Sequence, residues 1–305
     1  MAATSAHLAG SLTFISDEVS QDLGAVAEFV REFRLSGFEL RSMFGRAFKD
    51  LTPADVGEIR TLTRGEGWRI HGCASPVFKC ALSDPEAARQ HLEIFKRSLE
   101  IAVALDCDLL RVFTFLRLPT KAENIGALGR VTDHFHELAA LARGTPVRLG
   151  IENEFSCIGA TADELFLLMT RLPDPRIGLV WDPCNILYLP DEPLPVTRGF
   201  SELKSRIFHI HLKDAVRKQG APGELCAASV PFGVGETGWR SHLAEIAASG
   251  YRGLLSLETH WRRQQLAEQS LHLPAGHAFS NGGAEASRTC FHNLQALIES
   301  MADPR

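Results

Sequence analysis

The chain lacks the features of several large protein classes. Its seven cysteines include no C-x-x-C pair, and an odd number of thiols fits reduced side chains in a cytoplasmic protein better than a disulfide framework. No apolar run approaches the length that crosses a bilayer, and the first sixteen residues lack the positive charge that begins a signal peptide. The net charge of −5, with Lys and Arg scattered along the chain, gives no basic footprint for nucleic acid. We therefore expect a cytoplasmic protein with no membrane partner and no nucleic-acid partner.

Internal repeats and low-complexity segments are also missing. At 305 residues with 45% hydrophobic content, the chain can bury a large core and has a length common among α/β barrels. The fingerprint G-x-G-x-x-G is absent from the first strand-to-helix turn, which argues against a doubly wound sheet that binds a dinucleotide. We expect one domain over residues 1–305, with its core at about 12–300.

The sequence does contain a regular alternation of short apolar strands and amphipathic helices. Such alternation implies parallel strands joined by right-handed crossovers. Eight units close most naturally into a (β/α)₈ TIM barrel, and a doubly wound open sheet is the alternative. Irregular segments are expected at 189–196, 217–237 and 258–283. The expected strands are 12–15, 38–41, 68–72, 109–113, 147–152, 177–182, 206–214 and 254–258, and the expected helices are about 22–35, 52–64, 83–105, 123–143, from 161 onward, 200–204, 239–248 and 284–301.

Four of these strands carry an ionisable side chain near their carboxyl end, on the face opposite their apolar residues. Successive strand residues point to opposite faces, which separates Glu152, Asp182 and Glu258 from the apolar residues of their strands and places His211 with His209. Active sites of barrels lie at the carboxyl ends of the strands. Two Glu, one Asp and one His converging there would make a divalent-metal site; solvated strand ends are the alternative. We expect His209, one layer deeper, to support the site through a hydrogen bond, and direct ligation of the metal is the alternative.

Other polar side chains share the inward parity or follow these strands. His71 and Arg111, like Glu39, are expected to project inward, either to bind substrate hydroxyls or to pair with charges inside the barrel. Lys213 could stabilise an oxyanion or be a surface charge. Glu154 could hydrogen-bond substrate, orient a ligand or be a loop carboxylate. The sequence leaves these alternatives open.

A glycine-rich loop follows the seventh strand. Backbone N–H groups around Gly233, Gly235 and Gly238 could cradle a phosphate. Glycines at such spacing more often permit a tight turn, and we favour that interpretation.

Four motifs occur in order along the chain: Val180-Trp-Asp182-Pro-Cys-Asn185, His209-Ile-His211-Leu-Lys213-Asp214, Pro231-Phe-Gly-Val-Gly-Glu236 and Ser256-Leu-Glu258-Thr-His260. In combination they resemble the sugar phosphate isomerase/epimerase superfamily of xylose isomerase-like TIM barrels, over roughly residues 12–300. That superfamily includes ketose 3-epimerases, hydroxypyruvate isomerases, inosose and 3-dehydroshikimate dehydratases and, more distantly, type IV AP endonucleases.

The resemblance implies one divalent metal ion bound by Glu152, Asp182, His211 and Glu258. Ligands of these types favour Mn²⁺ or Mg²⁺, with Co²⁺ or Zn²⁺ as further possibilities. Arg217 stands six residues after His211, the spacing of an arginine that binds substrate oxygens in ketose epimerases. Asn185 and Arg111 stand where the endonuclease branch has histidines, which leaves a three-metal nuclease site incomplete. The candidate substrate-binding residues are Arg217, His71, Arg111, Lys213, Glu154 and Asn185.

The expected activity is metal-dependent isomerisation or epimerisation of a sugar or a sugar-like polyol carbonyl. Glu152 and Glu258 are the candidate acid/base pair, and the metal would act as a Lewis acid that makes the proton next to the carbonyl removable. A dehydratase or lyase of the same superfamily, including one that cleaves C-glycosides, is the alternative. An AP endonuclease-like phosphodiesterase is a weaker alternative, and a non-catalytic sugar-binding barrel is a third class. The expected partner is a small sugar or polyol, and a homo-oligomer is compatible with the sequence.

Overall fold

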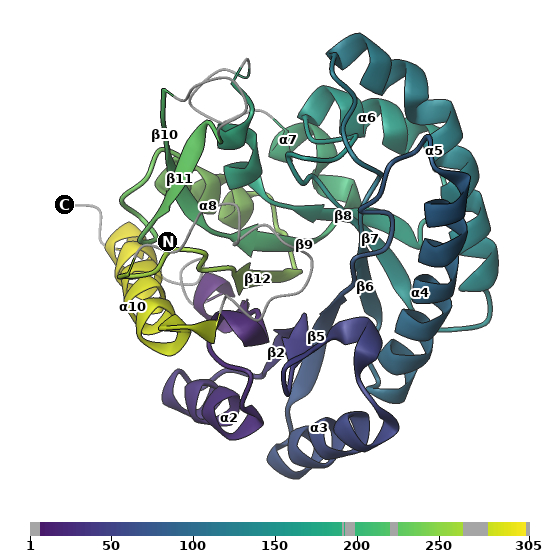
Figure 1. Ribbon diagram of the computed structural model, residues 1–305. Helices are drawn as coiled ribbons and strands as arrows, with labels where there is room; N and C mark the ends of the chain where they lie inside the picture. Colours follow the sequence, from purple (N-terminus) through teal and green to yellow (C-terminus); the bar gives the residue numbers. More distant parts are fainter. Residues whose placement is uncertain (1–6, 191, 193–198, 220–224, 265–279, 303–305) are drawn as a thin grey trace.

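A ring of parallel strands lies at the centre of the protein, surrounded by helices (Figure 1). The structure is a computed structural model and describes residues 7–190, 192, 199–219, 225–264 and 280–302. The sheet has eight strands in the order β1-β12-β9-β8-β7-β6-β5-β2. A parallel bridge between Ile15 and Glu39, and a 3.2 Å hydrogen bond from Thr13 Oγ1 to the Gly37 carbonyl, bring the two outer strands together, so the barrel is nearly closed. The strands are β1 (Leu12–Phe14), β2 (Gly37–Leu40), β5 (Arg69–Ala74), β6 (Leu109–Val112), β7 (Arg148–Glu152), β8 (Ile177–Trp181), β9 (Ile207–Leu212) and β12 (Leu254–Leu257).

Helices between the strands form the outer layer. Thr52, Thr120 and Thr161 each begin a helix with a capping box, in which a threonine hydroxyl and an acidic side chain satisfy backbone N–H groups at the helix start. None of the helices in the described part of the chain is long and apolar enough to cross a membrane. The expected alternation and the TIM barrel are confirmed. The helices are α2 (Leu23–Glu32), α3 (Pro53–Glu66), α4 (Pro85–Ala104), α5 (Lys121–Leu141), α6 (Ala162–Arg171), α7 (Phe200–Leu203), α8 (Trp239–Ala248) and α10 (Gly283–Ala302).

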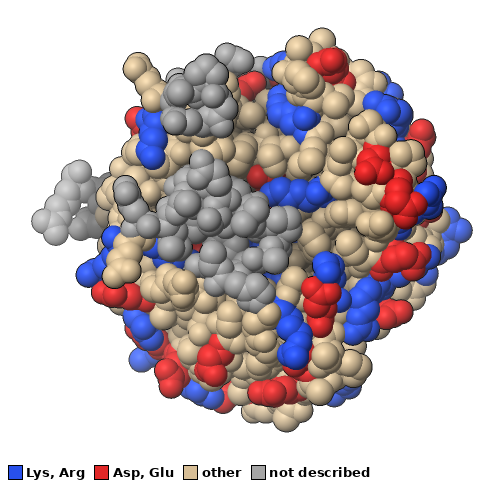
Figure 2. Space-filling view, in the orientation of Figure 1, with Lys and Arg blue, Asp and Glu red and all other residues tan. Residues whose placement is uncertain are grey.

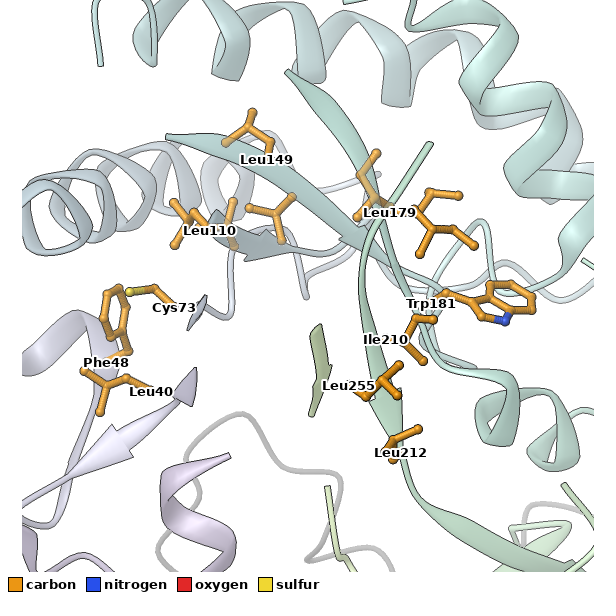
Figure 3. Packing of buried hydrophobic residues seen from close by; sticks show 14 of the residues in the cluster. Leu40, Phe48, Cys73, Leu110, Leu149, Leu179, Trp181, Ile210, Leu212 and Leu255 are labelled. Atoms are coloured by element: carbon orange, nitrogen blue, oxygen red, sulfur yellow. The ribbon is translucent and has the colours of Figure 1, made fainter. Parts of the chain in front are cut away.

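The core lies between the strands and the helix layer. Figure 3 shows Leu110, Leu149, Leu179 and Ile210 on successive strands, and all four are buried. Because side chains alternate along a strand, packing these residues against the helices turns their neighbours toward the barrel interior. This arrangement gives the interior of the barrel its polar residues.

The structure differs from the expected pattern in two hairpins. β10 (Asp214–Arg217) pairs antiparallel with β11 (Ala227–Val230), where an irregular loop is expected. β3 (Ser42–Met43) pairs with β4 (Arg46–Ala47) just after β2. Strands this short carry too few alternating residues to leave a pattern in the sequence. The expected irregular segments 189–196 and 258–283 lie largely outside the described residues.

Short 3₁₀ helices complete the connections between the main elements. Two of them directly follow barrel-strand ends and carry polar residues toward the site, namely η1 (Ser16–Glu18) after β1 and η3 (Pro183–Tyr188) after β8. The others are η2 (Phe48–Asp50) and η4 (Lys204–Arg206).

Candidate metal centre

The four side chains predicted as metal ligands lie together at the carboxyl ends of four neighbouring strands. Glu152 ends β7, His211 is the penultimate residue of β9, and Asp182 and Glu258 directly follow β8 and β12. One ligand atom of each residue lies within 4.8 Å of the ligand atoms of the other three, and all four residues are buried. The fold therefore forms the expected cluster; that these residues bind a metal stays a prediction.

The donor atoms fit a hard divalent cation. Three carboxylates and one imidazole, with no thiolate, suit Mn²⁺ or Mg²⁺ and accept Zn²⁺. Buried carboxylates need positive charge nearby, since an unpaired buried charge is costly. In this cluster Lys213 Nζ lies 2.5 Å from Asp182 Oδ2 and 2.8 Å from Glu258 Oε2. Lys213 thus gives positive charge to two of the carboxylates that a divalent ion would use.

Glu39 orients the imidazole of His211. The two Glu39 carboxylate oxygens lie 3.1 and 3.2 Å from His211 Nε2, while Nδ1 lies 3.4 Å from Glu152 Oε1 and 3.6 Å from Glu258 Oε2. A neutral imidazole that donates from Nε2 to a carboxylate keeps Nδ1 as the acceptor, directed at the cluster. Glu39 also lies 3.0 Å from Nε2 of His209. His209 therefore has the hydrogen-bonded position, one layer deeper, that the sequence predicts.

Burial and neighbouring charges shift the pKa values of two carboxyl groups of the cluster in opposite directions. Burial by itself raises the pKa of Glu152, but Arg111 and His211 outweigh burial and lower this pKa to about 2. Arg111 Nη1 lies 3.3 Å from Glu152 Oε2. Burial raises the pKa of Asp182 to about 6; Lys213 opposes this shift, and the nearby Glu258 and Glu152 reinforce it. A divalent ion bound here would favour the ionised form of Asp182, which burial and the neighbouring carboxylates disfavour.

Besides Lys213, three further candidate substrate-binding residues lie at or next to this cluster. Arg111 contacts Glu152 as described, and Asn185 Nδ2, in η3, donates to Glu152 Oε1 at 3.4 Å. Glu154 follows β7 and accepts from the backbone N–H of Ser156 at 3.0 Å, and Lys79 Nζ lies 3.4 Å from its other oxygen. These three positions agree with a substrate-binding role, which stays a prediction.

The two remaining candidate substrate-binding residues lie away from the four predicted metal ligands. His71 Nε2 lies 3.0 Å from the hydroxyl oxygen of Ser36, which directly precedes β2, so His71 stands near the amino ends of the strands. The expectation that His71 reaches the mouth is corrected, because strand parity fixes the face of a residue and not its depth. Arg217, at the end of β10, donates to the carbonyls of Leu187, Leu189 and Glu192 at 3.3, 3.1 and 2.9 Å. Its guanidinium fastens the segment that follows η3.

A second cluster of buried charges adjoins Glu258, and it is not predicted in the sequence analysis. Arg41, which follows β2, contacts Glu258 and two acidic residues of η1, and His260 Nε2 lies 3.2 Å from Glu258 Oε1. The only feature of the sequence that could predict this cluster is the position of its residues near strand ends. Other polar residues share that position, so it does not single these residues out. In Figure 2, positive and negative side chains meet at the centre of this face, next to the residues drawn in grey. The cluster comprises Asp17, Glu18, Arg41, Glu258, His260 and Arg262.

The glycine-rich loop is a turn around a carboxylate. The N–H groups of Gly233 and Gly235 donate to Asp214 Oδ2 at 3.0 and 2.9 Å, and the N–H of Thr237 donates to Asp214 Oδ1 at 3.3 Å. A Cβ atom on Gly235 would lie 2.2 Å from Asp214 Oδ1, so this position requires glycine. These amides are taken by the protein's own carboxylate, which rules out the phosphate cradle and confirms the tight turn.

Comparisons with known proteins agree with this architecture. A family model described as xylose isomerase-like TIM barrel matches residues 27–280. The IOLI protein with a bound zinc atom is 16% identical with a TM-score of 0.71, over 95% of this chain and 98% of that one. A D-allulose 3-epimerase from Methylomonas sp., in complex with D-allulose, is 14% identical with a TM-score of 0.65, over 93% and 96% of the two chains.

A probable 3-DHS dehydratase, AsbF, from Bacillus anthracis is 13% identical with a TM-score of 0.64, over 97% of this chain and 100% of that one. A search of curated proteins gives no match. At these identities the solved structures establish the fold, and the family model covers most of the sequence. The chain therefore belongs to the xylose isomerase-like TIM barrel family.

Proposed function

We propose that the chain is a divalent-metal-dependent isomerase or epimerase of a sugar or a sugar-like polyol carbonyl. The observation that carries this proposal is the convergence of Glu152, Asp182, His211 and Glu258 at the carboxyl ends of four barrel strands. A divalent ion held by these residues, Mn²⁺ or Mg²⁺ by ligand type, would supply Lewis-acid polarisation of the substrate carbonyl.

Glu152 and Glu258 are the candidate bases. Two strands lie between β7 and β12 in the barrel, so the two carboxylates reach the mouth from different sides. Burial disfavours the ionised form of Glu258, but Lys213 and His260 hold the pKa of its carboxyl well below the usual range. Both carboxylates are therefore ionised at neutral pH and can accept a proton on an Oε atom. One base that returns the proton to an adjacent carbon gives isomerisation, and two bases on opposite faces give epimerisation.

A dehydratase is the second candidate function. The same proton removal followed by loss of a β-hydroxyl gives dehydration, and the fold is shared with the probable 3-DHS dehydratase. A phosphodiesterase finds less support. Asn185 and Arg111 direct N–H groups to within 3.4 and 3.3 Å of Glu152, where a nuclease of this superfamily would need further ligand atoms.

The proposal also covers the cellular compartment of the protein and the type of its substrate. All seven cysteines are free, which fits a reducing cytoplasm. The similar epimerase is solved with D-allulose, and a small ketose or related polyol carbonyl is the substrate type proposed here.

The test follows hydrogen exchange at carbon. Mn²⁺-loaded protein incubated with a panel of ketoses in D₂O should place deuterium on the carbon next to the carbonyl, as NMR can detect. Glu152→Gln and Glu258→Gln keep the side-chain size and remove the basic oxygen, so each should lower exchange by at least about 10²-fold.

Glu100→Gln is the matched control, because Glu100 lies on α4 with its side chain 69% exposed, and exchange should be unchanged. Exchange that survives both active-site changes would reject this pair as bases. Turnover without deuterium would point to a hydride shift between adjacent carbons.

A further inference from the structure

Two cations beside the metal centre share one aromatic ring. The Arg111 guanidinium lies 4.2 Å and Lys79 Nζ 4.9 Å from the centroid of Phe113. Arg111 contacts Glu152 Oε2 at 3.3 Å, and Lys79 lies 3.4 Å from Glu154 Oε1. The side chains of Lys79 and Glu154 are 12% and 7% exposed. The Lys79–Glu154 pair is therefore half of a two-pair arrangement whose other half holds a candidate base.

Other cations around the mouth are also paired with carboxylates. Lys213 contacts Asp182 and Glu258, Arg41 contacts Glu258, and Arg262 lies 2.8 Å from Glu18 Oε2. The backbone amides of the glycine-rich loop are likewise taken, by Asp214. An anionic group on a substrate would have to displace one of these carboxylates or lie close to it, and like charges in a buried site are strongly unfavourable.

Two buried oxygen atoms beside the metal centre, in contrast, accept no hydrogen bond within the described residues. Asn185 Oδ1 has no hydrogen-bond partner, and Glu154 Oε1 has only its ion-pair contact with Lys79 Nζ at 3.4 Å. The orientation of the Asn185 amide is set by its Nδ2 group, which donates to Glu152 Oε1. A buried acceptor gains most from a group that donates a hydrogen bond. A hydroxyl can donate, whereas a phosphate dianion or a carboxylate cannot.

We infer that the substrate is an uncharged polyhydroxy carbonyl compound, and that the Lys79–Glu154 pair excludes phosphorylated and acidic analogues. This inference rests on the function proposed above and names its substrate class. Substrate hydroxyls donate to Glu154 Oε1 and Asn185 Oδ1. Glu154 neutralises Lys79, which would otherwise attract a phosphate to the mouth.

Titration calorimetry on Mn²⁺-loaded protein tests the inference by measuring the affinity of each ligand. The ligands are neutral ketoses of four to six carbons and the terminal phosphate ester of each, and titrations of the same ligands into free Mn²⁺ serve as blanks. In the wild type, each ester should bind at least about tenfold more weakly than its parent. Glu154→Gln removes the negative charge that faces Lys79 and adds an N–H donor, so the ratio should move toward the ester by about tenfold or more. Adding Lys79→Met should restore the preference for the neutral ketose.

Asp163→Asn is the matched control, since it removes a carboxylate from Lys121 in an exposed ion pair, and it should leave the ratio unchanged. An ester that binds the wild type as tightly as its parent, a ratio unaffected by Glu154→Gln, or a panel in which no neutral ketose binds would each overturn the inference. Deuterium exchange on the same samples separates the two proposals. Neutral ketoses that bind without exchange would contradict the proposed reaction and leave the substrate class standing.

Discussion

Arg41 Nη1 lies 2.6 Å from Glu258 Oε1, so the residue that follows β2 holds the carboxylate that follows β12. The same guanidinium lies 3.0 Å from Asp17 and 2.7 Å from Glu18, and all of these side chains are buried. One cation thus joins the carboxyl ends of three barrel strands and fixes a candidate base. Removing a partner from such a network leaves uncompensated buried charge.

Replacing Arg41 by Met should therefore lower the free energy of unfolding by about 3–5 kcal/mol, as measured by urea unfolding. Arg31→Met is the control, because Arg31 pairs with Glu66 at the surface with its side chain 50% exposed. An exposed pair contributes about 1 kcal/mol or less. Equal losses in the two variants would contradict the structural role of the buried network.

The contact between Glu39 and His211 predicts an effect on metal affinity. Glu39→Gln should weaken Mn²⁺ binding by about 10–100-fold, because the amide no longer fixes the imidazole through a charged acceptor. His211→Ala and Asp182→Ala should lose stoichiometric metal while circular dichroism shows a folded barrel, since each removes a ligand and little apolar area. Titration calorimetry measures all three. Full metal occupancy in both alanine variants would reject the ligand assignment.

Arg217→Ala should raise KM or lower kcat on the substrate without changing metal content. Its guanidinium donates to three backbone carbonyls in and after η3, the 3₁₀ helix that carries Asn185. Loss of these bonds loosens a segment beside the candidate base Glu152 and leaves the ligand set intact. The neighbouring Lys218 is exposed, and Lys218→Ala should behave as the wild type. Unchanged kinetics in Arg217→Ala would remove this residue from the site.

The lowered pKa of His71 leads us to expect that the stability of the protein depends on pH. Burial, followed by His209 and Arg69, lowers the pKa of His71 to about 4, whereas an unfolded histidine titrates near 6.5. Between these values the unfolded state binds a proton that the folded state rejects, so stability is lost as the pH falls from about 6.5 to 4. The loss amounts to at most about 3 kcal/mol. The free energy of unfolding of the wild type should therefore fall relative to that of His71→Gln between pH 7 and pH 4, and a constant difference would contradict the shifted pKa.

The sequence by itself determined the barrel and the identity of the converging residues. Eight strands lie where the apolar alternation predicts them, because one face of each strand must be buried against helices. The same alternation turned Glu152, Asp182, His211 and Glu258 to the inner face. Parallel strands bring their carboxyl ends to one side of the barrel, so these four side chains had to approach one another.

Only the tertiary structure decided how deep each inward-facing side chain lies in the barrel and which side chain it contacts. His71 has the predicted parity and yet stands near the amino ends of the strands, because depth depends on the register between neighbouring strands, which shifts between β2 and β5. Arg41 and Glu258 are in contact although they are 217 residues apart in sequence. Lys79, which follows β5, contacts Glu154, which follows β7. Alternation along a strand is a local property that fixes the face of a side chain. Its partner depends on strand order, register and side-chain reach, which exist only once the barrel has closed.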